Sequence, residues 1–166
     1  MMIQVLAAVT LTLTSTNFTS GGTLPKSAEY NQYGCTGNNT PPKLVWSGAP
    51  AATKSFALTM HDPDAKAPGG WWHWVVFNIP ESRASLDTSA ESTVISWVEG
   101  TTSFKTRGYG GPCPPPGTPH HYDFTLYALD VTTIPGANGD TTGPDLVAAM
   151  QGHVVAKATL TGMYGR

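Results

Sequence analysis

Residues 61–80, HDPDAKAPGGWWHWVVFNIP, decide how this sequence folds and where its chemistry lies. The run 54–62 alternates apolar and polar residues, which is the period of a half-buried β-strand. The run 73–80 reads as a second strand, and a Pro/Gly loop separates it from the first. If the two strands pair as antiparallel neighbours, Asp62 and His73 meet at one end of the sheet on its core side.

The composition describes one loop-rich β domain that spans residues 1–166. Only 12% of the residues are charged, whereas the chain contains 18 glycines and 14 prolines. The formal net charge of -2 gives no basic surface for nucleic acid. No apolar run is long enough for a transmembrane segment.

Further strand-like runs lie between turn clusters at 9–18, 43–48, 122–131 and 154–165. The stretch 141–153 predicts a helix, because a proline stands in its first turn and a glycine follows its last apolar residue. A shorter helix is expected around 87–92. The chain is therefore expected to be mainly β: an antiparallel, Greek-key-like β-sandwich of two sheets, with a helix near the C-terminus and an anion pocket at one end.

The pocket is expected where polar residues begin or end the inner faces of strands. On 73–80, the inner face is expected to carry His73, Val75, Phe77 and Ile79, while Tyr122 begins the inner face of its own strand. The loop before Tyr122, GYGGPCPPPGTPHHY (108–122), is rich in proline and arrives already shaped. Its glycines let a ligand approach the backbone, and imidazole, phenol and amide groups can donate to an anion.

Each of these residues also has an ordinary structural explanation. Asp-Pro-Asp is often only a turn, in which aspartate side chains accept from backbone amides. A single histidine on an apolar face is more often a satisfied core residue than a ligand group. The joint placement of Asp62, His73 and the 108–122 loop is what favours a binding pocket.

These segments resemble the two signature regions of the phosphatidylethanolamine-binding protein family, which includes the Raf-kinase inhibitor proteins and plant flowering regulators. The matching motifs are DPDA, the Trp-His-Trp strand start, and GPCPPPGTPHHY. LTLTSTNFTSGGTLP, GCTGNNTPPKLVWSGAP and AMQGHVVAKATLTGMYGR resemble the bacterial branch, so the resemblance covers nearly the whole chain. It implies a two-sheet β-sandwich with a small pocket for phosphate-type head groups.

The resemblance places the family's pocket residues on Asp62, Pro63, Trp71, His73, Gly111, Pro112, His120 and Tyr122. Two positions depart from the family's pattern. Lys66 replaces a proline, which loosens the loop and adds a positive charge near the mouth. His121 stands where the family usually has an arginine, so an ion pair from that arginine is in doubt.

The expected function is non-catalytic binding of an anionic small molecule or phospholipid head group, without a metal or cofactor, by a monomer or homodimer. The same loops could inhibit a protease or kinase, as some family members do. The alternative is a metal-assisted hydrolase using Asp62, Asp64, His73 and His120. The sequence contains neither H-E-x-x-H nor G-x-S-x-G, and no nucleophile is evident.

The expected mechanism places His73 against Asp62. A carboxylate beside the ring would favour the imidazolium form, which donates from both nitrogens. Anion binding is then expected to tighten as the pH falls from neutral toward about 6, because the ordinary histidine pKa is near 6.5.

Cys35 and Cys113 form no C-x-x-C pair, which leaves one disulfide or two free thiols. Because both accompany the bacterial-type motifs, we expect a disulfide, worth roughly 3–5 kcal/mol in a chain-entropy account. A periplasmic or secreted location is then favoured over a cytoplasmic one. The N-terminal MMIQVLAAVTLTLT lacks the basic start of a signal peptide. Its first residues fit both the remnant of a trimmed leader and an ordinary lead-in to the first strand.

Overall fold

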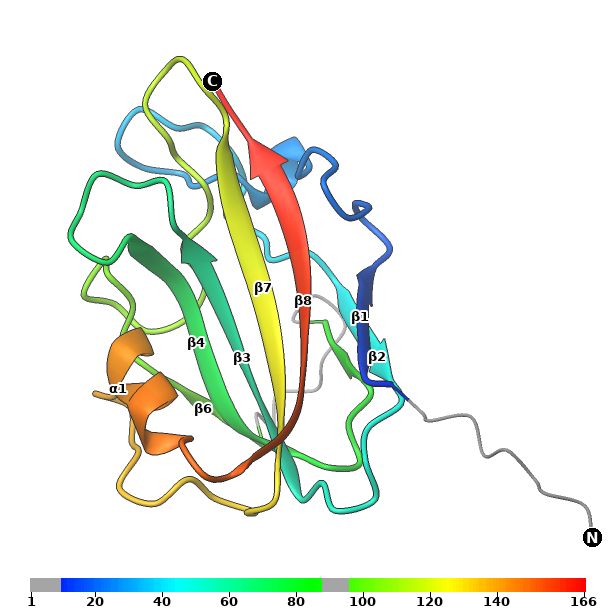
Figure 1. Cartoon of the computed structure of the whole chain (residues 1–166). Helices are drawn as coiled ribbons and strands as arrows, with labels where there is room; N and C mark the ends of the chain where they lie inside the picture. Colours follow the sequence, from blue (N-terminus) through cyan, green and yellow to red (C-terminus); the bar gives the residue numbers. More distant parts are fainter. Residues whose placement is uncertain (1–9, 88–95) are drawn as a thin grey trace, which may run out of the picture.

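The computed structural model describes residues 10–87 and 96–166, and within them the chain forms two antiparallel sheets (Figure 1). The five-stranded sheet has the order β6-β4-β3-β7-β8: Val98–Glu99, Trp71–Pro80, Ser55–Asp62, His120–Leu129 and Val154–Tyr164. The three-stranded sheet has the order β1-β2-β5: Thr12–Ser15, Leu44–Ser47 and Ser85–Leu86. The predicted mainly β, two-sheet fold is confirmed, although β1 is much shorter than the run 9–18.

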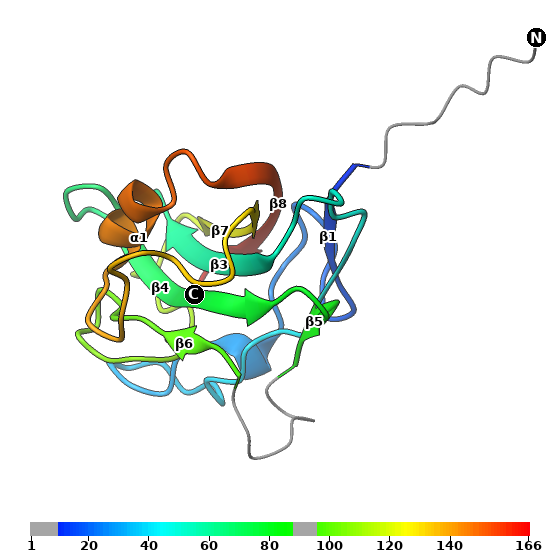
Figure 2. The same ribbon diagram turned by 90° about the horizontal axis from the view of Figure 1, so that it is seen from below.

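The main core lies between the two sheets, which Figure 2 shows from below. Leu13 and Trp46 reach it from the small sheet, while Phe56, Phe124 and Leu126 reach it from the large one. The alternation read from 54–62 and 122–131 therefore places the right residues inside. Period-two alternation is a reliable guide here because neither strand is interrupted along its pairing with the other.

The face expected for 73–80 is wrong in its middle. Val75 and Phe77 point to the outer side of the large sheet, whereas His73 and Ile79 lie on the inner side. The cause is two irregularities in the β3–β4 ladder, each of which gives β4 one more residue than β3. Each such bulge reverses which residues face inward.

The helix α1, Gly143–Ala149, covers the outer side of β4 (Figure 1). Thr142 caps its N-terminus by accepting from the Asp145 N–H. Leu146 packs against Val75 and Phe77, which explains why those two residues are buried on the outer face. The predicted C-terminal helix is thus confirmed, with shorter bounds than 141–153.

Two smaller points complete the architecture. A 3-10 helix, η1, spans Lys26–Ala28. The shorter helix expected around 87–92 falls outside the described residues apart from Asp87. No helix in the described ranges is long and apolar enough to cross a membrane.

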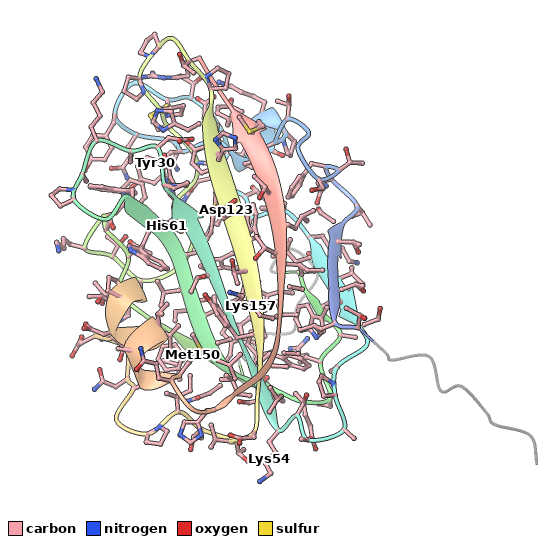
Figure 3. The ribbon with its side chains drawn as sticks, viewed as in Figure 1. Tyr30, Lys54, His61, Asp123, Met150 and Lys157 are labelled. Carbon is pink, nitrogen blue, oxygen red and sulfur yellow. A yellow bond between two sulfur atoms is a disulfide. The ribbon has the colours of Figure 1, made fainter. Side chains whose placement is uncertain are left out.

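The end of β3 and the starts of β4 and β7 lie at the same end of the large sheet, close to the C-terminus (Figure 1). In Figure 3, Tyr30 and His61 mark this end, whereas Lys54 and Met150 mark the opposite one. The expectation that the polar ends of these strands meet is confirmed.

Candidate functional site

A cavity of about 570 Å³ opens at this end of the sandwich. Five of the predicted site residues line it: Asp62, Trp71, His73, His120 and Tyr122. Its volume lies within the range typical of small-molecule sites. The sequence-based placement of the pocket therefore agrees with the position of this cavity.

His73 is buried in the cavity floor at the bulge in β4. Its Nδ1 lies 2.7 Å from the carbonyl oxygen of Gly110, so Nδ1 carries the proton. Burial lowers the pKa of His73 to about 4, although the Gly110 carbonyl and the Asp62 charge act in the opposite direction. The expected imidazolium is therefore wrong: the ring is neutral at physiological pH.

Asp62 lies beside His73 in the cavity, but it pairs with a different histidine. Its Oδ2 accepts from Nδ1 of His120 at 2.7 Å. Its Oδ1 accepts from the backbone N–H groups of Asp64 and Ala65 at 2.8 and 3.1 Å. The expected Asp62–His73 pair is therefore wrong, and Asp62 pairs with His120. His73 cannot donate to Asp62, because its ring N–H already donates to the Gly110 carbonyl oxygen.

Tyr122 completes the floor. Its ring packs edge-on against His73, with the ring centroids 5.2 Å apart. Its hydroxyl is fully buried and has no hydrogen-bond partner among the described residues. Burial, together with the nearby charge of Asp62, raises the pKa of the Tyr122 hydroxyl well above its ordinary value. The hydroxyl is thus protonated.

The other three predicted residues do not line the cavity. Pro63 is exposed beside it. Gly111 donates from its N–H to Asn39 Oδ1 at 2.7 Å, and the carbonyl oxygen of Pro112 accepts from Tyr30 N–H at 3.0 Å. Residue 111 must be a glycine because another part of the chain packs against it, and not because a ligand does. A Cβ added there would lie 2.0 Å from the Ala28 carbonyl oxygen. Gly111 and Pro112 therefore build the wall that supports the site.

Sequence reasoning missed part of the lining, which comes from two other loops. Tyr33 lies in the segment after η1, and Phe104 and Lys105 lie between β6 and β7. Phe104 packs edge-on against both Trp71 and His73, with centroid distances of 5.4 Å. A single aromatic residue in the otherwise polar stretch TTSFKTRG was the available signal.

The Cys35–Cys113 disulfide is confirmed, and Cys113 lines the cavity. It joins the Tyr33 loop to the proline-rich loop before β7. The disulfide thus holds two walls of the cavity together.

Asp64 and His121, which the sequence singled out separately, form a second pair on the exposed side of the same loop. The Asp64 carboxylate accepts from both the backbone N–H and the ring Nδ1 of His121 at 2.7 Å. These bonds lower the pKa of Asp64 and raise that of His121. The ion pair that was in doubt without the family's usual arginine is therefore replaced by the His121–Asp64 pair.

Within the described residues, no group of three or more His, Cys, Asp or Glu side chains could hold a metal ion. The carboxylates of Asp62 and Asp64 are instead occupied by histidine and backbone N–H donors. The hydrolase alternative therefore finds no preformed set of metal ligands in this part of the chain.

Comparison with known proteins gives a consistent match. Residues 14–165 match the profile of a family described as phosphatidylethanolamine-binding protein. The UPF0098 proteins YbcL and YbhB of Escherichia coli are 39% and 38% identical to this chain. The alignments cover 95% and 92% of this chain, and 88% and 98% of the relatives.

Solved structures agree with this result. The crystal structure of E. coli YbcL, described as a new member of the mammalian PEBP family, superposes with a TM-score of 0.87 at 37% identity, over 94% of this chain and 98% of that one. A putative phosphatidylethanolamine-binding protein homologue from Chlamydia trachomatis, CT736, gives a TM-score of 0.82 at 34% identity. The superposition covers 99% of the CT736 chain and 95% of this chain.

Proposed function

The chain belongs to the phosphatidylethanolamine-binding protein family, and from this membership we propose that it is a non-catalytic binding protein for phosphate-type or phospholipid head groups. The observation that carries the proposal is the Tyr122 hydroxyl, which is buried at the cavity floor without a partner among the described residues. An unsatisfied buried hydroxyl costs about 1–3 kcal/mol, and a bound ligand would remove that cost.

The charges at the cavity mouth favour an anionic group. Lys66 and Lys105 line the cavity and are both exposed, so their ammonium groups stand at the rim. The rim therefore provides two positive charges and the hydrogen-bond donors that a phosphate ester requires.

Calorimetric titration with ethyl phosphate tests this proposal. We expect saturable one-to-one binding that weakens at least tenfold in the double variant Lys66→Met/Lys105→Met. The matched control is Lys54→Met/Lys157→Met, which removes the same charge at positions that do not line this cavity. Equal weakening in both double variants would show a non-specific charge effect, and no binding at all would refute the proposal.

The source of the phosphate ester is tested with a second probe. Vesicles of phosphatidylethanolamine and phosphatidylcholine should bind the protein if a membrane lipid supplies the group. Binding of ethyl phosphate without vesicle binding would assign the site to soluble phosphate esters. Both outcomes support the shared chemistry, and they distinguish its sources.

Non-catalytic binding requires that the probe be recovered unchanged. Phosphate release from ethyl phosphate is therefore measured with and without added Mg²⁺ or Zn²⁺. Metal-dependent release that is lost in Asp62→Asn would favour the hydrolase alternative instead. Inhibition of a protease or kinase by the loops around the cavity stays a prediction.

A further inference from the structure

Asn39 holds the two peptide bonds of Gly110 in the cavity wall. Its Nδ2 donates to the Tyr109 carbonyl oxygen at 3.1 Å, and its Oδ1 accepts from the Gly111 N–H at 2.7 Å. The residue between these two contacts, Gly110, is the one that exchanges two hydrogen bonds with His73. Asn39 itself is not a lining residue of the cavity.

These hydrogen bonds fall on two planar units. The first peptide plane contains the Tyr109 carbonyl and the Gly110 N–H, and the second contains the Gly110 carbonyl and the Gly111 N–H. In the described part of the chain, each plane has one bond to Asn39 and one to His73. A plane that is held at both of its polar groups cannot rotate without breaking a bond.

Gly110 and Gly111 need such a restraint from outside. Two consecutive glycines leave the backbone more conformational freedom than any other pair of residues. Glycine is required at both positions, because an added Cβ would lie 2.5 Å from the Phe104 ring at 110 and 2.0 Å from the Ala28 carbonyl oxygen at 111. The close packing of the wall thus demands flexible residues, and the Asn39 carboxamide supplies the rigidity that they lack.

Asn39 is itself fixed in place. Its φ is 52°, in the left-handed region that asparagine enters more readily than most residues. Its N–H donates to the Glu29 carbonyl oxygen at 2.8 Å. Glu29 is buried, and its carboxylate accepts from Lys26, Thr36 and Tyr164. The carboxamide is therefore anchored through Glu29 to the interior of the fold.

The ring of His73 needs this wall because packing alone does not set its tautomer. Phe104 and Tyr122 contact the ring edge-on, with centroid distances of 5.4 and 5.2 Å. Such contacts fix the plane of the ring but do not distinguish a protonated ring nitrogen from an unprotonated one. That distinction comes from the hydrogen bond that Nδ1 donates to the Gly110 carbonyl oxygen at 2.7 Å.

We propose that Asn39 is a positioning residue of this site: it aims the Gly110 carbonyl oxygen at His73 and so fixes the ring with its proton on Nδ1. The inference rests on the proposed function, since a ligand in the cavity meets the tautomer that Asn39 sets. Asn39 acts through the two Gly110 peptide planes, and its own side chain is not part of the cavity lining.

NMR of the histidine ring nitrogens at pH 7 tests the inference. In the wild-type protein we expect one His73 tautomer, protonated at Nδ1, and the signals that are missing in His73→Asn assign it. Asn39→Gly removes both side-chain bonds, while glycine tolerates the left-handed φ. Its His73 ring should populate both tautomers, so the Nδ1 and Nε2 shifts should move toward each other.

Asn78→Gly is the matched control. Asn78 also has a positive φ, 56°, and its Oδ1 accepts from the Ile134 N–H at 2.9 Å, but it does not line this cavity. Its replacement should lower the urea midpoint and leave the His73 nitrogen shifts unchanged. Equal movement of these shifts in Asn39→Gly and Asn78→Gly, or no movement in Asn39→Gly, would overturn the positioning role.

Asn39→Asp gives a second test if Asn39→Gly does not fold. Aspartate keeps an oxygen for the Gly111 N–H but loses the donor to the Tyr109 carbonyl oxygen. One peptide plane is thus released, and the His73 nitrogen shifts should move in the same direction by a smaller amount. No movement in this variant would overturn the inference.

Ethyl phosphate calorimetry links the tautomer to the ligand. Because the loosened wall must be ordered again on binding, affinity should fall about fivefold in Asn39→Gly and stay unchanged in Asn78→Gly. Unchanged or tighter binding by Asn39→Gly would overturn the role of Asn39 in binding. If the wild-type protein binds no ethyl phosphate, the proposed function fails, whereas the nitrogen shifts still decide whether Asn39 positions His73.

Discussion

His73 and Gly110 exchange two hydrogen bonds: the ring Nδ1 donates to the Gly110 carbonyl oxygen at 2.7 Å, and Gly110 N–H donates to the His73 carbonyl oxygen at 2.9 Å. This pair fastens the loop before β7 to the bulge in β4. Burial, and not this pair, keeps the imidazole neutral, because the Gly110 carbonyl taken alone raises the pKa of His73. His73 is therefore a structural link and an acceptor at the same time.

The neutral ring predicts how stability depends on pH. Because the folded pKa of His73 is about 4, below the ordinary 6.5, the unfolded chain binds more protons between these values. The free energy of unfolding should then fall as the pH drops from 6.5 to 4, by at most about 3 kcal/mol from this residue. Well above pH 6.5, where the histidine is neutral in both states, His73 contributes no slope.

Urea unfolding of the protein and of His73→Asn at several pH values measures this contribution. Asparagine retains an N–H donor for Gly110 but cannot titrate. The variant is expected to be less stable overall and to show a shallower slope between pH 4 and 6.5. Identical slopes would mean that folding does not lower the pKa of His73.

The parts of the fold that the sequence predicted are those with uninterrupted local patterns. On β3 and β7, residues such as Phe56 and Phe124 face the core as their alternation predicts. On β4 the two bulges reverse the alternation, and one of them adjoins Asn78, which has a positive φ of 56°. The sequence pattern does not reveal where a bulge lies, so this reversal could not be predicted from it.

The site residues that lie at the end of a strand could be predicted from the sequence. Asp62, His73 and Tyr122 satisfy that condition. Phe104 enters the site through a loop whose position depends on packing against distant segments. The partner of Asp62 was misassigned for a related reason, because only the folded loop brings the Gly110 carbonyl to His73.

The Asp64–His121 pair predicts a shifted histidine titration on the exposed side of the loop. The bonds from Asp64 raise the pKa of His121, so the link is complete below pH 6.5 and weakens as the pH rises through the folded value. NMR titration should show His121 above the ordinary 6.5, and Asp64→Asn should bring it back. His121→Arg should keep the link to Asp64 and abolish its pH dependence between 6 and 8. An unchanged His121 titration in Asp64→Asn would assign the shift to other groups.

Glu29 predicts sensitivity to acid. This buried carboxylate accepts from Lys26 Nζ at 2.5 Å, from Thr36 N–H at 2.7 Å and from the Tyr164 hydroxyl. Burial alone would raise its pKa, but these bonds outweigh burial and lower the pKa to about 2.

The stability that Glu29 contributes is therefore complete above pH 4.5 and is lost as the pH falls toward 2. At neutral pH, Glu29→Gln should lower the free energy of unfolding by about 2 kcal/mol. Denaturant unfolding at pH 7 and pH 3 measures the difference, which should shrink at the lower pH. A constant difference would show that the charge of Glu29 is not what stabilises the fold.

The Cys35–Cys113 disulfide predicts that stability and ligand binding are coupled through the cavity wall. Its two cysteines are 78 residues apart, so in a chain-entropy account it stabilises the fold by about 4 kcal/mol. Because Cys113 and Tyr33 line the cavity from the two loops that it joins, breaking it should also loosen the binding site. Cys35→Ser/Cys113→Ser should thus unfold at lower urea and bind ethyl phosphate more weakly than the oxidised protein.

Arg166 provides a way to separate the two effects, because it joins the same loops without the disulfide. Its side chain donates to the carbonyl oxygens of Pro114 and Gly34 at 2.7 and 3.2 Å. In the oxidised protein, Arg166→Gln should therefore change ethyl phosphate affinity little, since the disulfide still holds the loops together. In the Cys35→Ser/Cys113→Ser background the same change should weaken affinity several-fold, because the two loops then lose both the disulfide and the Arg166 bonds that join them next to the cavity. Equal effects in both backgrounds, measured by calorimetry at a temperature where each variant is folded, would show that the loops are held independently of one another.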